Sequence, residues 1–166
     1  NFTSFDVNEH IRRTIISRMT QLEEKELEIE TDFEADPCFV SADGDQIHQV
    51  LINLMDNAIK FTPKGGCISL FTREKEGLIH VTVKDNGPGV LPEDAPHIFD
   101  RFYKADKAHT TGKGTGLGLA ICKRIMEKHG QGIWLVPGEH GAAFEFTLSK
   151  GKDNGGKHAD QGTGKD

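Results

Sequence analysis

The sequence feature that most constrains the fold is an uninterrupted amphipathic pattern over residues 45–61. Apolar side chains recur there at i, i+3, i+4, i+7, i+8, i+11 and i+12, which are Ile47, Val50, Leu51, Leu54, Met55, Ala58 and Ile59. This spacing is that of one face of an α-helix. The pattern therefore predicts a long helix with one side buried.

A second helical pattern precedes this helix, and a third follows it. Over residues 7–24, Ile11, Ile15, Ile16 and Met19 stand at helical spacing, with Asp6 in position to cap the first turn. The other pattern runs from about residue 116 to 129 and is ended by a glycine, Gly130.

Strand-like patterns fill much of the rest of the chain. They cover residues 27–33, 39–40, 67–73, 78–84, 133–136 and 143–148. Gly77 separates the third from the fourth, so these two are expected to form a hairpin. Helices and strands mix without strict alternation. The expected fold is thus an α+β two-layer sandwich, with a mixed sheet packed on about three helices on one face.

The length of 166 residues suits one well-packed domain. Residues 150–166 contain five of the 19 glycines, and Ala159 is their only aliphatic side chain. Such a segment cannot bury enough apolar surface to offset its ordering entropy. The domain is therefore expected over residues 1–149, followed by a disordered tail over 150–166.

Composition excludes several classes of protein. The chain has 20 Lys and Arg against 26 Asp and Glu, a net charge of −6, which argues against a nucleic-acid binder. It contains no 18-residue apolar run and no basic-then-apolar leader, so neither a membrane span nor a signal peptide is expected. Cys38, Cys67 and Cys122 are widely spaced and form no C-x-x-C pair. A reducing, cytoplasmic location is expected, without disulfides or zinc.

Three polar residues of the long helix form the first candidate site. Asn53, Asn57 and Lys60 are spaced i, i+4, i+7 and share a stripe that borders the apolar face. At the rim of a core, amide oxygens can bind a hard cation and a lysine can meet an anion. The alternative is an ordinary solvated face, although two asparagines within a helix lower its propensity.

A second candidate is the segment Asp85-Asn86-Gly87-Pro88-Gly89-Val90 at the end of a strand. Asp85 shares parity with the apolar residues of that strand, so its carboxylate is expected to point inward, where it needs a hydrogen-bond donor. An adenine amino group is a suitable donor, and the two glycines let a planar ligand approach the backbone. The alternative is a common Asp-Asn-Gly turn.

A third candidate is the run Gly112-Lys113-Gly114-Thr115-Gly116-Leu117-Gly118-Leu119, which leads into the last helix. Free N–H groups at a helix start can bind phosphate. The run does not match a P-loop or a dinucleotide-binding fingerprint, and its alternative is a flexible linker.

Aromatic and basic residues lie between the second and third candidates. Phe99 and Phe102 stand three residues apart, and the stretch from Arg101 to Lys113 contains four basic residues, Arg101, Lys104, Lys107 and Lys113. On an acidic protein, this composition favours a lid that closes over a polyanion, although the two aromatics could also be core anchors. The eight histidines are scattered and show no metal-ligand spacing.

Four of these segments resemble, in order and spacing, the ATP-binding catalytic domain of bacterial two-component sensor histidine kinases, in the GHKL ATPase superfamily. Residues 49–61 (QVLINLMDNAIKF) are similar to the N box, and 85–90 (DNGPGV) to the first G box. Residues 99–104 (FDRFYK) are similar to the F box, and 114–119 (GTGLGL) to the second G box. One box alone is a weak signal, whereas four in order are specific. The resemblance covers about residues 5–149.

The resemblance implies a site for ATP and Mg²⁺ between the N-box helix and a lid. It implies Asn57 as the Mg²⁺ ligand, and Asn53 and Lys60 as phosphate contacts, with Phe61 nearby. It implies Asp85 for the adenine amino group, in a pocket shaped by Gly87, Gly89 and Val90. It further implies Arg101 and Lys104 near the terminal phosphate, and Gly114, Thr115, Gly116, Leu117 and Gly118 around the phosphate chain. The catalytic group is then Asn53, Lys60, Arg101 and Lys104.

Two departures from the wider superfamily sharpen the expected function. Its ATP hydrolases carry a glutamate one helical turn before the Mg²⁺-binding asparagine to activate water, whereas this chain has Asn53 there. No histidine of the chain has the H-E/D-x-x-x-P-like context of the family's phosphoacceptor. The resemblance therefore implies transfer of the γ-phosphoryl group to a histidine on a separate dimerisation domain, with a response regulator acting downstream. The lone domain is expected to be monomeric, to contact no membrane and not to autophosphorylate, although the parent kinase is usually membrane-anchored.

Two other classes of function stay open at this point. One is another ATPase of the superfamily, chaperone-like or topoisomerase-like, or a serine kinase that acts on a regulatory protein. The other is a catalytically silent module for nucleotide binding or protein docking. Steady-state hydrolysis of ATP would identify the hydrolases of the first class. Failure to bind ADP or an ATP analogue, even with Mg²⁺, would favour a docking module.

Overall fold

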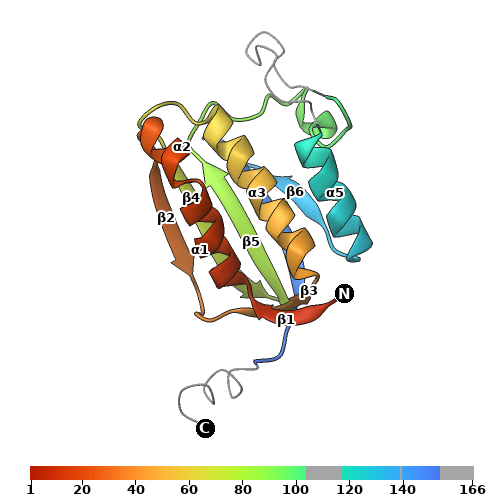
Figure 1. Ribbon diagram of the computed structural model, residues 1–166. Coiled ribbons are helices and arrows are strands. Elements are labelled where there is room, and N and C mark those ends of the chain that lie inside the picture. The colour runs from red at the N-terminus through yellow and green to blue at the C-terminus, as the bar shows by residue number, and fades with distance from the viewer. Residues whose placement is uncertain (104–116, 139, 154–166) are drawn as a thin grey trace.

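The computed structural model describes residues 1–103, 117–138 and 140–153. Figure 1 shows one layer of helices over a twisted sheet. The strands are β1 Thr3–Asp6, β2 Glu28–Phe33, β3 Phe39–Ala42, β4 Cys67–Lys75, β5 Leu78–Asp85, β6 Ile133–Val136 and β7 Ala143–Lys150. The helices are α1 Val7–Ser17, α2 Met19–Glu24, α3 Gly44–Phe61 and α5 Gly118–Lys128, with a short 3-10 turn at Ala95–His97.

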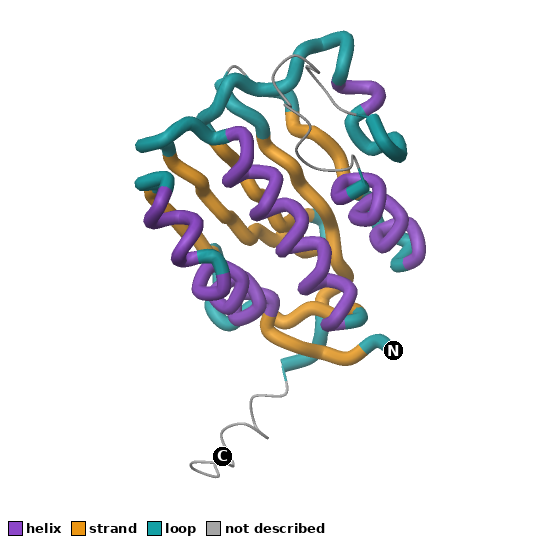
Figure 2. Tube along the Cα trace, turned by 45° about the horizontal axis from the view of Figure 1, so that its top comes forward, coloured by secondary structure: helices purple, strands orange, loops and turns teal. Residues whose placement is uncertain are grey.

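The sheet is mixed, as predicted. Its strand order is β1-β3-β7-β5-β4-β2. Strand β6 lies outside this order and pairs with residues 143–146 of β7. The β2–β4 pair is parallel, and the other pairs are antiparallel, including the predicted β4–β5 hairpin. Figures 1 and 2 place α1, α3 and α5 on the same face of the sheet, with α3 in the middle. The two-layer sandwich expected from the sequence is confirmed.

The hydrophobic core lies between these helices and the sheet. Six of the seven apolar positions that predicted α3 are buried, and Ile59 is half-buried. Asp43 caps the helix, since its Oδ1 accepts from the N–H groups of Asp45 at 3.1 Å and Gln46 at 3.2 Å. From the sheet side, alternate residues such as Val81 and Phe146 are fully buried. Among the described residues, no helix is long and apolar enough to cross a membrane.

The first helical pattern proves to be two helices. The chain leaves the helical conformation at Arg18, where φ is −114° and ψ is 13°. This break lets the Arg18 guanidinium reach Asp56 on α3 through two hydrogen bonds, of 2.6 and 3.1 Å. Ile16 and Met19, predicted for the buried face, are instead 69% and 41% exposed. The prediction of one continuous helix over 7–24 was therefore wrong, because the helix is interrupted at Arg18, whose side chain contacts a residue far away in the sequence.

The ends of the domain also differ from the prediction. β1, which the sequence patterns did not predict, pairs with β3 from Thr3↔Ala42 to Asp6↔Phe39. The tail was expected to start at residue 150, but Lys150 ends β7 and the N–H of Gly151 donates to the Phe39 carbonyl at 2.9 Å. Backbone hydrogen bonds between neighbouring strands need no apolar side chains, which is why composition did not reveal them. Residues 154–166 lie outside the described part.

Candidate functional site

Helix α3 presents the predicted polar stripe at the rim of the core. Asn53 and Asn57 are half-buried and Lys60 is exposed, as the spacing indicated. The Lys60 ammonium lies 5.1 Å from the centre of the Phe61 ring, at cation–π distance. The stripe therefore combines two partly desolvated amides with one cation.

Asn53 joins α3 to α5. Its Oδ1 accepts from Gln49 Nε2 at 2.8 Å, and its Nδ2 donates to the Gly118 carbonyl at 3.2 Å. The structure thus brings the N-box helix against the first turn of α5, where the second G box ends. This helix begins at Gly118, two residues later than predicted, and Leu117 just before it is half-buried.

Asp85 ends β5 with its side chain turned inward, as its parity predicted. The residue is only 4% exposed, and its Oδ1 accepts from the N–H groups of Gly87 at 2.8 Å and Ala142 at 3.2 Å. Burial raises the pKa of Asp85, and these two backbone donors oppose that rise. Within the described residues, both hydrogen bonds end on Oδ1, which leaves Oδ2 as the acceptor for a further donor.

Glycines allow three backbone segments to meet around this carboxylate. A Cβ on Gly87 would lie 2.6 Å from the Phe61 carbonyl oxygen, so the loop passes directly over the end of α3. Gly89 has φ +86° and lies against Gly141. A Cβ on Gly141, where φ is +68°, would lie 1.9 Å from the Asp85 carbonyl oxygen. Gly141 could not be predicted as a site residue, because no local pattern connects it to a residue 56 positions earlier.

Replacing Gly141 with alanine should destabilise the domain, because the added methyl group meets backbone and the positive φ disfavours any Cβ. We expect the free energy of unfolding to fall by about 2–4 kcal/mol in urea titrations followed by circular dichroism. Gly138→Ala in the same loop is the matched control, since a Cβ there has no heavy atom within 4 Å. Equal losses for the two variants would contradict this account.

The F-box aromatics have different roles. Phe99 is half-buried and packs edge-on against Phe144, with ring centres 5.9 Å apart. Phe102 is 63% exposed, has φ +63°, and lies under the Arg101 guanidinium at 5.5 Å. The core-anchor interpretation therefore holds for Phe99 alone. The other basic residues and the glycine run, Lys104, Lys107, Gly112, Lys113, Gly114, Thr115 and Gly116, lie outside the described residues.

Residues 42–152 match the family described as "Histidine kinase-, DNA gyrase B-, and HSP90-like ATPase". The chain belongs to this ATPase family. The motifs that predicted it, the N box and the first G box, are also the segments that the Gly87 contact brings together.

Similar curated proteins include sensor kinases. The chain is 40% identical over 139 residues to sensor histidine kinase WalK of Bacillus subtilis, covering 81% of this chain and 23% of the relative. It is 43% identical over 128 residues to sensor protein KdpD of Clostridium acetobutylicum, covering 76% and 14%. It thus spans less than a quarter of either protein.

Solved structures of catalytic domains match over almost their whole length. The catalytic domain of histidine kinase ThkA superposes with a TM-score of 0.81 at 33% identity, covering 92% of this chain and 99% of that one. Full-length ShkA in complex with AMPPNP gives a TM-score of 0.78 at 27% identity, covering 90% and 32%. The similarity predicted from the four boxes, to the ATP-binding catalytic domains of sensor histidine kinases, is confirmed.

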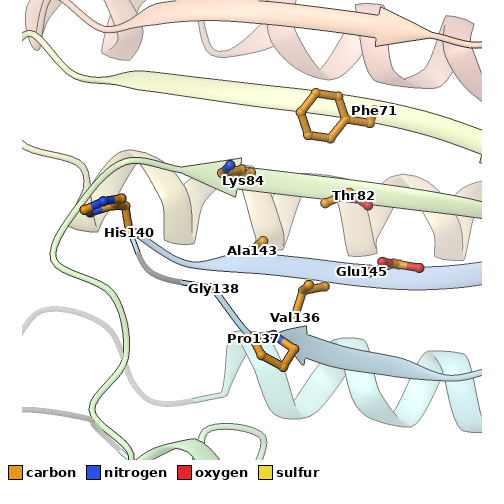
Figure 3. A pocket seen from close by; sticks show the side chains of 10 residues that line it. Phe71, Thr82, Lys84, Val136, Pro137, Gly138, His140, Ala143 and Glu145 are labelled. Atoms are coloured by element: carbon orange, nitrogen blue, oxygen red, sulfur yellow. The ribbon is translucent and has the colours of Figure 1, made fainter.

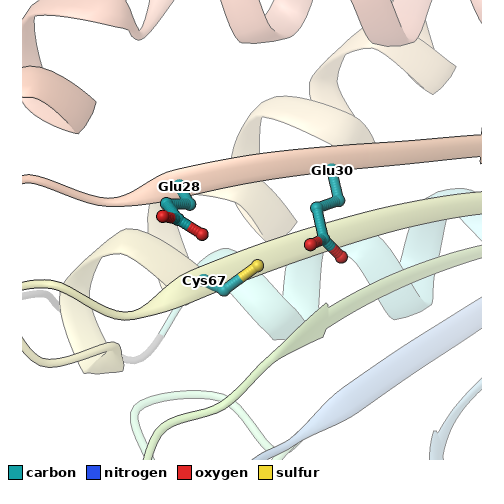
Figure 4. A group of neighbouring side chains, drawn as sticks. All are labelled: Glu28, Glu30 and Cys67. Atoms are coloured by element: carbon teal, nitrogen blue, oxygen red, sulfur yellow. The ribbon is translucent and has the colours of Figure 1, made fainter.

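Two other features of this ATPase domain lie on the face of the sheet that carries no helices. A hollow of about 460 Å³ opens on the sheet face that carries no helices, between Phe71, Lys84, Pro137 and His140 (Figure 3). On the neighbouring strands β2 and β4, Glu28, Glu30 and Cys67 bring one potential ligand atom each within 4.8 Å of the others (Figure 4). Both glutamates are exposed, and none of these residues belongs to the four boxes.

Proposed function

We propose that this domain binds ATP with Mg²⁺ and donates the γ-phosphoryl group to a histidine on a separate dimerisation domain, in two-component signal transduction. The observation that carries the proposal is the Asp85 carboxylate, which is 4% exposed yet has only two backbone N–H groups as donors in the described part. An ionised carboxylate in such a place favours a ligand that brings a donor of its own.

The exocyclic amino group of adenine fits this requirement. It would donate to Asp85 while the ring lies against the backbone of Gly87 and Gly89, where side chains are absent. Gly87 lies over the end of α3, so the base and the polar stripe would be close together. That proximity supports a single ligand with a planar base and a charged chain.

The polar stripe suits the phosphate chain. Asn57 offers a half-buried amide oxygen, a ligand type that Mg²⁺ accepts in a mainly oxygen coordination shell. When bound, Mg²⁺ would supply charge neutralisation of the phosphates. Lys60 and Arg101 would hold the phosphate oxygens, as would Lys104 and the run from Gly114 to Gly118. The acceptor nitrogen would attack the γ-phosphorus as the bond to the β-phosphate oxygen breaks, and ADP would leave.

The residue at position 53 favours transfer over hydrolysis. An asparagine amide cannot take a proton from water, and the hydrogen bonds of Asn53 to Gln49 and Gly118 hold it in place. ATP bound here would therefore persist until another nucleophile arrives. The solved complex of histidine kinase ThkA with response regulator TrrA, 32% identical and with a TM-score of 0.78, supports a two-component role.

The proposal is tested first on the chain alone. Calorimetry should show binding of ADP that tightens with Mg²⁺, and a steady-state assay should show only slow release of phosphate from ATP. Absence of ADP binding would favour the docking module. Rapid phosphate release would favour a hydrolase of the same family.

A further inference from the structure

Residues 91–103 follow the first G box and include the F box as far as the structure describes it. They form a series of tight turns. Backbone N–H groups donate three residues back, from Asp94 to Leu91 at 2.9 Å, from His97 to Asp94 at 2.8 Å and from Asp100 to His97 at 2.9 Å. Ile98 at the centre is 5% exposed and belongs to the core. The segment is therefore ordered around one buried anchor.

A buried carboxylate closes this segment. Asp94 is 7% exposed, and its Oδ1 accepts a hydrogen bond from the Tyr103 hydroxyl nine residues later. Burying an ionised carboxylate is costly unless a donor reaches it, so this hydrogen bond stabilises the folded-back arrangement of the segment. The N–H of Tyr103 also donates to the Asp100 carbonyl at 3.3 Å.

The closure spans a strained residue. Phe102 has φ +63°, a conformation that an aromatic residue adopts only when its surroundings impose it. With this left-handed backbone conformation, the Phe102 ring lies in solvent, whereas the next residue, Tyr103, reaches Asp94 with its hydroxyl group. The Tyr103 ring also packs against His97, and the two ring centres lie 5.3 Å apart.

We propose that Asp94 and Tyr103 are positioning residues for phosphoryl transfer, whose hydrogen bond holds the turn at Phe102 and so orients Arg101. The link to Arg101 is direct, because its guanidinium lies over the Phe102 ring at 5.5 Å. If the bond is lost, the strained turn relaxes and Arg101 moves with the ring. This inference rests on the proposed function, in which Arg101 contacts the terminal phosphate.

Tyr103→Phe removes one oxygen and is the least disruptive test. Transfer from ATP to a separately made histidine-bearing hairpin of the parent kinase should slow about 10- to 100-fold, since a small misplacement of a catalytic group has effects of this size. ADP affinity should stay within about twofold of wild type, because the base site is untouched. Asp94→Asn keeps an acceptor oxygen and should retain most of the activity. Glu93→Gln, at an exposed neighbouring carboxylate, is the matched control and should be unchanged.

A double-mutant cycle separates a pair from two independent residues. Tyr103→Phe combined with Asp94→Ala should transfer no more slowly than the slower single variant, because both changes break the same bond. Losses that multiply would overturn the proposal, as would Tyr103→Phe transferring at the wild-type rate. If Asp94→Ala fails to fold, Tyr103→Phe alone decides.

A spectroscopic readout is independent of nucleotide. Tyr103 is the single tyrosine of the chain, so tyrosinate absorbance reports on it alone. The hydrogen bond to Asp94, with the nearby charges of Glu93 and Asp100, raises the pKa of Tyr103, and His97 also faces the ring. Asp94→Asn should lower this pKa toward the ordinary value of about 10. A wild type that transfers nothing would count against the proposed function. An unchanged tyrosine titration in Asp94→Asn would overturn the pair itself.

Discussion

Asp85→Asn should abolish adenine-nucleotide binding without destabilising the fold at neutral pH. Asparagine keeps an oxygen for the N–H groups of Gly87 and Ala142, so the loop contacts survive. Its amino group, however, would face the amino group of adenine, two donors with no acceptor between them. We expect affinity for ADP to fall at least about 100-fold, because a site built around a hydrogen bond strongly rejects a mismatched partner.

The stability half of this prediction follows from linkage. Burial raises the pKa of Asp85, so the folded state favours the protonated carboxyl. The stability contributed by the protonated Asp85 carboxyl is fully present below its ordinary pKa of about 3.9, and it is lost as the pH rises through the raised pKa of the folded state. At higher pH the folded protein bears the full cost of burying the charged carboxylate. Asparagine carries no such charge. The variant should therefore melt no lower than wild type at neutral pH.

Calorimetry with ADP and thermal unfolding measure the two halves on the same samples. Asp32→Asn, on the exposed side of edge strand β2, is the matched control and should bind ADP like wild type. A variant at position 85 that binds ADP within about threefold of wild type would remove the assignment of the adenine site. Lost binding together with a large drop in melting temperature would show a structural role instead.

Asn57→Ala should abolish Mg²⁺-dependent phosphoryl transfer. Removal of the amide oxygen takes away the proposed metal ligand, and the charge neutralisation that the metal supplies is worth several kcal/mol in such reactions, or about 100-fold or more in rate. ADP binding measured with a chelator present should be nearly unchanged, since the base site does not include Asn57. The metal-dependent gain in affinity should disappear.

The neighbouring residue provides the control for this variant. Asp56 is exposed and forms an ion pair with Arg18, away from the proposed site. The Asp56→Ala variant should therefore transfer phosphate at close to the wild-type rate. Loss of the ion pair should lower its stability only in part. Wild-type transfer by Asn57→Ala would disprove the assignment of the metal ligand. Equal defects in the two variants would indicate damage to α3 itself.

Local patterns predicted most of the fold because its elements have clear periodicities. The helical spacing of the apolar residues from Ile47 to Ile59 predicted α3, and the parity of Asp85 with Val81 and Val83 predicted that its carboxylate points inward. Both depend on residues within a few positions of one another. The order of four boxes then indicated the family, which the comparisons confirm.

Most of the features that could not be predicted depend on residues far apart in the sequence. Strand β1 depends on β3 for its backbone partners, and Arg18, at the break between α1 and α2, contacts Asp56 on α3. Gly141 matters only because Asp85 lies beneath it. The closure of Asp94 by Tyr103 depends on a strained turn at Phe102, which has no local signature. Sequence periodicity carries no information on such contacts.

The most direct test of the central claim is a transfer experiment with four components. The chain, Mg²⁺ and ATP labelled at the γ-phosphate are mixed with the separately made histidine-bearing hairpin of the parent kinase, and the label is followed on each protein. We predict that label accumulates on the hairpin in an acid-labile, base-stable bond, as phosphohistidine requires, and that none stays on the chain. Release of the label as inorganic phosphate, with the hairpin unlabelled, would contradict the account.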